Sequence, residues 1–285
     1  MRKFVLVTES GSDLPQYYAE KYDIKVVTMH VNFQDESRDD LDINGQVVFD
    51  YYDKHKILPK TSGSTPNDFL KVFKEINENY PGAEIIYIAY SAVTTVSYNS
   101  AKIAAEEFSN IHMVDSKNVS IGLSTVVIEA AKFIENNPDT TAEEIIKYVE
   151  DIRERIRFVF LPQTLLYLRA GGRISNVAYL GAMILKIYPT IDLDDGYLVA
   201  GTKYRGSFKK AYEKMINDFF NKFDIDKEFI RAGSTPGLSD EHQQEIIKLI
   251  KGHGVKEVEW LEAKAVISTH GGPGAVGFVG IEKKK

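Results

Sequence analysis

Residues 4–12, FVLVTESGS, decide the fold, because an apolar, β-rich run ends there in small polar residues and a glycine. The same pattern returns at 85–91 (IIYIAYS) and at 111–116 (IHMVDS), each time ahead of a helical segment. Short strands that alternate with helices are typical of a parallel sheet with crossover helices. In such sheets the ligand lies beyond the carboxyl ends of the strands, so these polar residues mark the expected binding edge.

Capping signals place the first helices. Thr65 with Pro66 predicts a helix that runs to about Asn79. The capping-box pattern at Thr141 predicts another that ends near Arg157.

The pattern changes after residue 158. Asp194-Asp195-Gly196 is a hairpin turn signal between two strands, and a long helix is expected over 207–223. Residues 265–268 are expected to form a strand. We therefore predict an α/β protein with an N-terminal domain of parallel sheet and crossover helices (1–157) and a C-terminal α+β domain with a mixed sheet (158–285).

Composition narrows the class of function. Among 285 residues there are 41 acidic and 35 basic side chains, a formal charge of -6, and no basic block, which disfavours nucleic acid as a partner. There is no cysteine, hence no disulfide, thiolate nucleophile or cysteine-based metal site. No stretch approaches a membrane span or a signal-peptide core, so we expect a soluble, cytoplasmic protein.

Two hydroxyl-rich turns are candidate anion sites. Residues 60–66 (KTSGSTP), with Thr61 and Ser62, precede a helix start, where hydroxyls and unpaired N–H groups can hold a carboxylate or phosphate. Residues 90–97 (YSAVTTVS), with Ser91, form a second such turn. Each turn alone could be a simple helix cap, but two of them favour convergence on one pocket.

A glycine-rich stretch, 268–277 (STHGGPGAVG), carries His270 and Gly271. Its last six residues match the spacing of a dinucleotide fingerprint, but only eight residues follow, too few for a helix and a returning strand. We therefore expect no nicotinamide cofactor. His270 is either structural or a hydrogen-bond donor to a carboxylate.

Arg169 and Arg173 lie in LLYLRAGGRI, 165–174, a short helix stopped by glycine. They either complement the helix dipole or recognise a phosphate or a partner.

The sequence contains few motifs that indicate catalysis. The sequence has no Gly-x-Ser-x-Gly peptide, Walker A loop or zinc spacing, and residues 39–42 (DDLD) are expected to be a solvated turn, not a magnesium site. A hydrolase that pairs Ser91 with His270 stays open as an alternative.

Five peptides, in order along nearly the whole chain, resemble the DegV family: 7–15 (VTESGSDLP), 58–62 (LPKTS), 114–117 (VDSK), 167–174 (YLRAGGRI) and 269–274 (THGGPG). The resemblance extends to the fatty-acid-binding subunits (FakB) of bacterial fatty acid kinase. It implies two domains with a long-chain fatty acid in a tunnel between them, and no catalysis or cofactor of the chain's own. A separate ATP-dependent kinase subunit of the FakA type would then make the acyl phosphate.

Carried over by position, the resemblance implies that the fatty-acid carboxylate is held by five residues: Thr61, Ser62, Ser91, His270 and Gly271. It places Arg169, Arg173 and Arg205 at the pocket mouth or the partner surface.

The chain departs from the family pattern at Glu9, Ala92, 94–97 and Tyr188, which bears on pocket shape and partner contact. Two other classes stay open beside the binding subunit: a stand-alone enzyme (the hydrolase above or a lipid kinase) and a lipid-sensing regulator.

Overall fold

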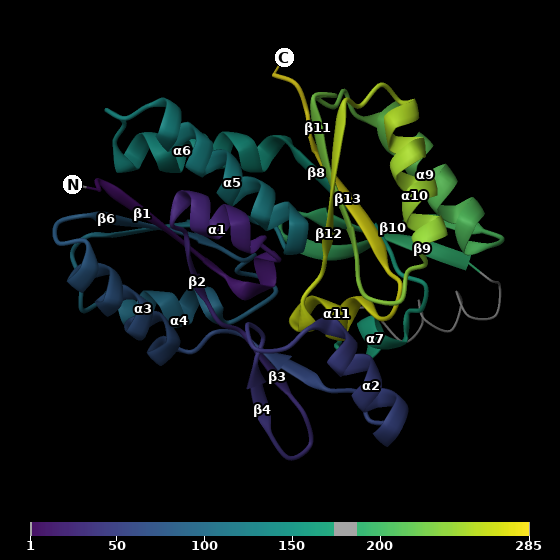
Figure 1. The fold of residues 1–285 in the computed structure, drawn as a ribbon, viewed down its shortest axis with the longest axis horizontal. Helices are drawn as coiled ribbons and strands as arrows, with labels where there is room; N and C mark the ends of the chain where they lie inside the picture. Colours follow the sequence, from purple (N-terminus) through teal and green to yellow (C-terminus); the bar gives the residue numbers. More distant parts are fainter. Residues whose placement is uncertain (1, 174–186, 285) are drawn as a thin grey trace.

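A computed structural model describes residues 2–173 and 187–284. Two large sheets lie side by side, and a small three-stranded sheet projects from their lower edge (Figure 1).

The N-terminal sheet is parallel throughout, in the order β2 (Lys25–Val27), β1 (Phe4–Glu9), β6 (Glu84–Ala89) and β7 (Ile111–Asp115). Its helices are α1 (Gln16–Tyr22), α3 (Pro66–Asn79), α4 (Ser97–Ala105), α5 (Ser120–Asn136) and α6 (Ala142–Arg155), and a short 3-10 turn (Ser10–Ser12) follows β1.

Both faces of this sheet are covered. All six residues of β1 are buried; Phe4 and Leu6 pack with α5 and α6, whereas Val5 and Val7 pack with α3 and α4. Burial on both faces explains why the strand is continuously apolar instead of alternating.

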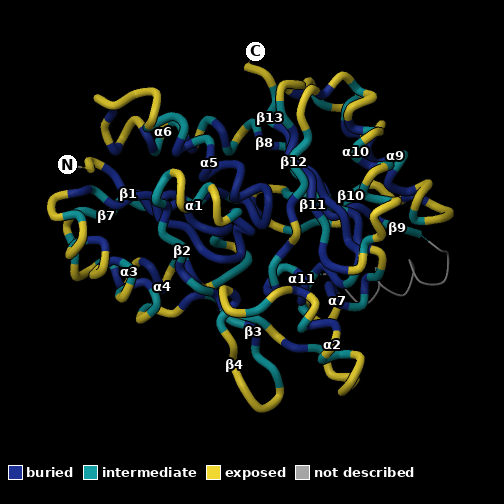
Figure 2. The backbone as a smooth tube through the Cα atoms, in the orientation of Figure 1, coloured by how far each residue is buried: buried dark blue, intermediate teal, exposed yellow. Residues whose placement is uncertain are grey.

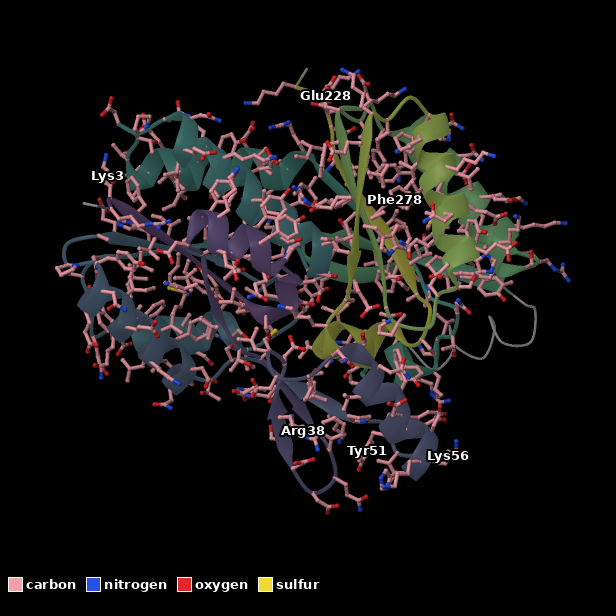
Figure 3. The ribbon with its side chains drawn as sticks, viewed as in Figure 1. Lys3, Arg38, Tyr51, Lys56, Glu228 and Phe278 are labelled. Carbon is pink, nitrogen blue, oxygen red and sulfur yellow. The ribbon has the colours of Figure 1, made fainter. Side chains whose placement is uncertain are left out.

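The C-terminal sheet is mixed, in the order β10 (Tyr197–Arg205), β9 (Ile187–Asp194), β8 (Ile156–Leu161), β13 (Val276–Ile281), β11 (Phe229–Ser234) and β12 (Glu257–Glu262). Its helices are α7 (Leu166–Ala170), α9 (Phe208–Lys222), α10 (Asp240–Gly252) and α11 (Ala265–Gly271). Phe278 on β13 is fully buried and lies in the middle of this layer (Figure 3).

Helix α5 connects the two halves. Its buried residues join one apolar cluster that includes Phe4 and Ile88 of the first sheet and Leu261 and Val279 of the second. Figure 2 shows this helix as a buried segment between the two sheets. A helix apolar on nearly all sides is a buried helix, so the halves share a core.

The small lobe consists of β3 (His30–Asn32), β4 (Ser37–Asp39), β5 (Lys60–Ser62) and α2 (Gly45–His55). Arg38, Tyr51 and Lys56 lie on it in Figure 3. Val48 and Phe49 of α2 pack in one cluster with Val266 of α11, which ties the lobe to the C-terminal half.

Most predicted elements are confirmed. Thr65 and Thr141 each form a capping box, and α3 ends at Asn79 as predicted, while α6 ends at Arg155, two residues early. The hairpin turns at Asp195 and Gly196, both with positive φ as a type I′ turn requires.

The strand predicted over 265–268 is wrong, because these residues form the start of α11. Periodicity cannot separate a short buried strand from a short buried helix. Tertiary packing decides here, because Ala265 and Val266 lie in one apolar cluster with residues of the small lobe.

We predicted a solvated turn at 39–42, but part of this turn is buried. Asp40 has no exposed surface, and its Oδ1 accepts a hydrogen bond from the Val266 N–H at 2.7 Å. Asp13 Oδ1 likewise accepts from the Lys264 N–H at 2.7 Å. These two carboxylates take the otherwise unpaired N–H groups around the start of α11.

The division into two domains stays our prediction. The boundary we placed after residue 157 falls inside β8, which begins at Ile156 and pairs only within the C-terminal sheet. We propose that the boundary lies at Arg155, where α6 ends.

Within the described ranges, 2–173 and 187–284, no helix is long and apolar enough to span a membrane.

We predict that Asp40→Ala lowers the free energy of unfolding by about 1–3 kcal/mol, because a buried N–H of α11 loses its acceptor. Asp42→Ala, on the same turn but exposed, should change it by less than about 0.5 kcal/mol. Chemical denaturation of both variants tests this, and equal effects would contradict the role given to Asp40.

Candidate functional site

The two hydroxyl-rich turns meet, as predicted. Ser64 N–H donates to Ser97 Oγ at 3.0 Å, which joins the first turn to the second. Gly63 is pressed against the second turn, since a Cβ there would lie 2.4 Å from Thr95 Oγ1. The glycine between the serines is therefore required by this close approach.

Thr61 and His270 form the centre of the site. Thr61 lies on β5 and His270 near the end of α11, and Thr61 Oγ1 is 2.7 Å from His270 Nε2 although the residues are 209 positions apart. In the tautomer with its proton on Nε2, His270 donates to Thr61 and leaves the threonine hydroxyl proton free for a ligand.

Gly171 and Arg173, at the end of α7, complete this part of the site. A Cβ on Gly171 would lie 2.3 Å from His270 Nδ1, so only glycine lets α7 approach the imidazole. Arg173 donates through Nη2 to the Thr94 carbonyl at 3.1 Å and so connects α7 to the second turn.

Thr61, Arg173 and His270 border a cavity of about 360 Å³ between the two halves of the molecule, within the size range of small-molecule sites. Its polar wall is made by Thr61, Ser62, Thr94, Thr95, Ser120, Arg173, Ser234, Thr235 and His270. The remainder is apolar and comes from both halves: Met29, Val119, Ile121, Phe158, Phe160, Leu168, Leu198, Leu261, Val266 and Ile267. The cavity thus suits a ligand with a polar head and an apolar body.

His270 is neutral at neutral pH. Burial, and to a lesser extent the charge of Arg173, lower its pKa to about 3. Nδ1 is buried without a hydrogen-bond partner in the described part of the chain. Arg173, not the imidazole, therefore supplies the positive charge at the cavity wall.

Glu9 supports the second turn through a hydrogen bond to its backbone. It is fully buried, burial raises its pKa to about 7, and its Oε2 accepts from the Tyr90 N–H at 2.7 Å. Glu9 does not line the cavity. Its departure from the family pattern therefore changes the support of the turn and not the cavity wall itself.

The predicted residues divide into two groups. Thr61, Ser62, Arg173, His270 and Gly271 all line the cavity, with Ser62 exposed at its rim.

Ser91 does not line the cavity, and its predicted contact with the carboxylate stays a prediction. It is fully buried, and its hydroxyl donates to the Gly196 carbonyl of the β9–β10 hairpin at 2.8 Å. Sequence position alone could not show that this hairpin folds back onto the second turn. Thr94 and Thr95 line the cavity instead.

Arg169 and Arg205 lie outside the cavity and are exposed, Arg169 on α7 and Arg205 at the end of β10. Tyr188 packs against Phe208 of α9, with ring centroids 5.7 Å apart, and so does not reach the cavity either. Ile174, the last residue of the predicted arginine motif, lies outside the described residues.

A Ser91–His270 pair does not form, because Ser91 bonds Gly196 while His270 Nε2 bonds Thr61. Thr61 itself is a poor nucleophile candidate. A general base works best with a pKa near the working pH and needs a group that orients it, whereas His270 has a pKa of about 3 and an unpartnered Nδ1.

The sequence matches the family model described as "Uncharacterised protein, DegV family" over residues 3–283. The chain belongs to the DegV family. A DegV domain-containing protein of Clostridium acetobutylicum is 30% identical over 291 residues, covering 99% of this chain and 100% of the relative.

Solved structures share the fold. A Thermus thermophilus DegV-family protein described by its fatty acid binding has a TM-score of 0.88 at 27% identity, over 99% of this chain and 100% of its own. DegV of Bacillus subtilis, described as a fatty acid binding protein, has a TM-score of 0.81 at 25% identity over the same shares. The fatty acid kinase B3 protein of Streptococcus pneumoniae, loaded with linoleic acid, shares the fold at a TM-score of 0.84 and 17% identity, over 99% of this chain and 100% of its own.

The low pKa of His270 predicts a pH-dependent stability. As pH falls below about 6.5 the unfolded chain takes up the imidazole proton first, so the native protein loses stability until about pH 3. In His270→Asn this loss is absent. We therefore subtract the wild type's free energy of unfolding from that of the variant. As pH falls from about 6.5 to about 3, this difference should increase by up to about 1.4 kcal/mol per pH unit.

Denaturant titrations at a series of pH values would measure this difference, in which the contributions of other acidic groups cancel. Parallel curves for the two proteins would show that His270 titrates normally.

Proposed function

We propose that this chain binds a long-chain fatty acid, with the carboxylate at Thr61 and His270 and the alkyl chain in the apolar cavity. The observation that carries the proposal is the Thr61–His270 pair, 2.7 Å apart, at the polar wall of a cavity that is otherwise apolar. Fatty acid binding by solved members of the family supports it.

The chemistry of the polar wall fits a carboxylate. The Thr61 hydroxyl can donate to one oxygen, Ser62 and the backbone around Gly271 border the same wall, and Arg173 provides a cation. Hydrogen bonds to an ionised group are stronger than those between neutral groups, so few donors suffice.

We further propose that the chain does not turn over the fatty acid but presents it to an ATP-dependent kinase subunit of the FakA type. The weak basicity of His270 and the lack of an orienting partner support binding over catalysis. In the described ranges no group of acidic and histidine side chains could hold a metal ion, so we expect the partner to bring any metal that ATP requires. Proximity to the partner's nucleotide would then be this chain's contribution.

Substitutions at the polar wall should weaken fatty acid binding. Thr61→Val and His270→Asn should each reduce the affinity by roughly 10- to 100-fold. The first removes the hydroxyl donor to the buried carboxylate, worth about 1–3 kcal/mol, and the second removes the imidazole that orients this hydroxyl. Ser91→Ala removes a hydroxyl that is bonded to Gly196, so its affinity should stay within about twofold of the wild type. Displacement of a fluorescent fatty acid measures all three.

Wild-type affinity in both Thr61→Val and His270→Asn would remove the proposed head-group site. A large loss in Ser91→Ala would instead restore Ser91 to it.

Arg205 tests the partner interaction. With a FakA-type kinase subunit and ATP, Arg205→Ala should form acyl phosphate at least about tenfold more slowly while binding fatty acid normally, because this exposed cation lies outside the cavity. Lys147→Ala, an exposed cation on α6, is the matched control and should react at the wild-type rate.

Acyl phosphate made without any kinase subunit would favour a stand-alone enzyme. Tight fatty acid binding with no reaction in the presence of the subunit would favour a lipid-sensing regulator.

A further inference from the structure

A buried ion pair lies next to the cavity. Arg231 on β11 has only 2% of its surface exposed, and its Nε lies 2.8 Å from Glu259 Oε2 on β12. Its other nitrogens donate to Thr125 on α5 and to Tyr18 on α1, each at 3.4 Å. Fully buried arginines are rare, and each of the three nitrogens of this one donates a hydrogen bond within the protein.

The strand register places this pair directly beyond the cavity. Gly233 and Leu261 are partners in the β11–β12 ladder and both line the cavity. Residues two apart along a strand point to the same side, so the next pair on that side is Arg231 and Glu259. Neither of them lines the cavity.

Helix α5 shows the same limit independently. Ile121 lines the cavity, and a Cβ on Gly233 would lie 3.5 Å from its Cγ2, so Ile121 faces the cavity end of β11. Thr125, one helical turn further, bonds Arg231 and does not line the cavity. Along each of the three elements β11, β12 and α5, a residue that lines the cavity is therefore followed by a residue of the polar cluster.

Beyond the cluster the molecule approaches its surface. The Glu259 side chain is 13% exposed, and Tyr18 and Phe229, whose rings contact the Arg231 guanidinium at 5.5 and 4.7 Å, are only partly buried. In this direction the ion pair and its aromatic neighbours lie between the cavity and the surface.

We propose that the Arg231–Glu259 pair is the end stop of the cavity and limits the length of the acyl chain; this inference rests on the fatty acid binding proposed above. A longer chain would have to displace one member and leave the other charged, buried and unpaired. The gain from burying a few more methylene groups is smaller than that cost.

The test removes both charges together, since a single substitution would strand the partner and unfold the protein. Arg231→Ala/Glu259→Ala and the wild type are titrated with a homologous series of saturated fatty acids. Same-side residues of a strand lie about 7 Å apart, the length of about five methylene groups in an extended chain, so the chain length at which affinity collapses should increase by up to about five methylene groups. For acids just beyond the wild-type limit, affinity should rise at least about tenfold.

Lys209→Ala/Glu245→Ala is the matched control, because this ion pair joins α9 to α10 at residues that do not line the cavity. It should keep the wild-type length limit. If the alanine double variant does not fold, Arg231→Val/Glu259→Val keeps β-branched packing in both strands and carries the same expectation.

A folded double variant with the wild-type length limit and wild-type affinity for shorter acids overturns the end stop. A wild type that binds no member of the series overturns the proposed function instead, so the two failures are distinguishable.

Discussion

Two buried carboxylates from the N-terminal half hold the helix that carries the site. Asp13 and Asp40 accept from the N–H groups of Lys264 and Val266, both at 2.7 Å, and so fix the start of α11. His270 and Gly271 lie at the other end of this seven-residue helix. A shift at the carboxylates would therefore move the imidazole away from Thr61. Burial raises the pKa of both carboxyls, that of Asp13 to about 7, so this anchorage has an electrostatic cost that the hydrogen bonds offset.

The cavity wall likewise contains few charged groups. Its imidazole is neutral, its single cationic side chain among the lining residues is Arg173, and the buried Arg231 beyond the cavity is bonded to Glu259. A wall that already contained a charged histidine would bind a carboxylate strongly and release it slowly. A neutral Thr61–His270 pair with one nearby cation fits the proposal that the protein binds a fatty acid and presents it to a partner.

Sequence patterns predicted the parts of this structure that depend on neighbours along the chain. Caps at Thr65 and Thr141, the turn at 194–196 and the continuously apolar strand at 4–7 are local signals, and each is present in the structure. The parts that failed depend on distant contacts. Residues 265–268 are helical because the small lobe packs on them. The bond of Ser91 to the Gly196 carbonyl also depends on a hairpin about a hundred residues later in the chain. Likewise, neither Arg231 nor Glu259 carries any motif, and only the register of β11 on β12 brings them together.

The 209-residue separation of Thr61 and His270 also has a consequence for synthesis. Domains fold from the N-terminus as the chain emerges, so the parallel sheet and the first hydroxyl-rich turn can form early. The imidazole, its supporting helix and the central strand β13 come much later, at residues 265–281. A nascent chain therefore has half of the cavity wall long before it has a closed cavity. In the folded protein α5 packs against β11 and β13. Until these strands are synthesised, this apolar surface of α5 is exposed and available to a chaperone.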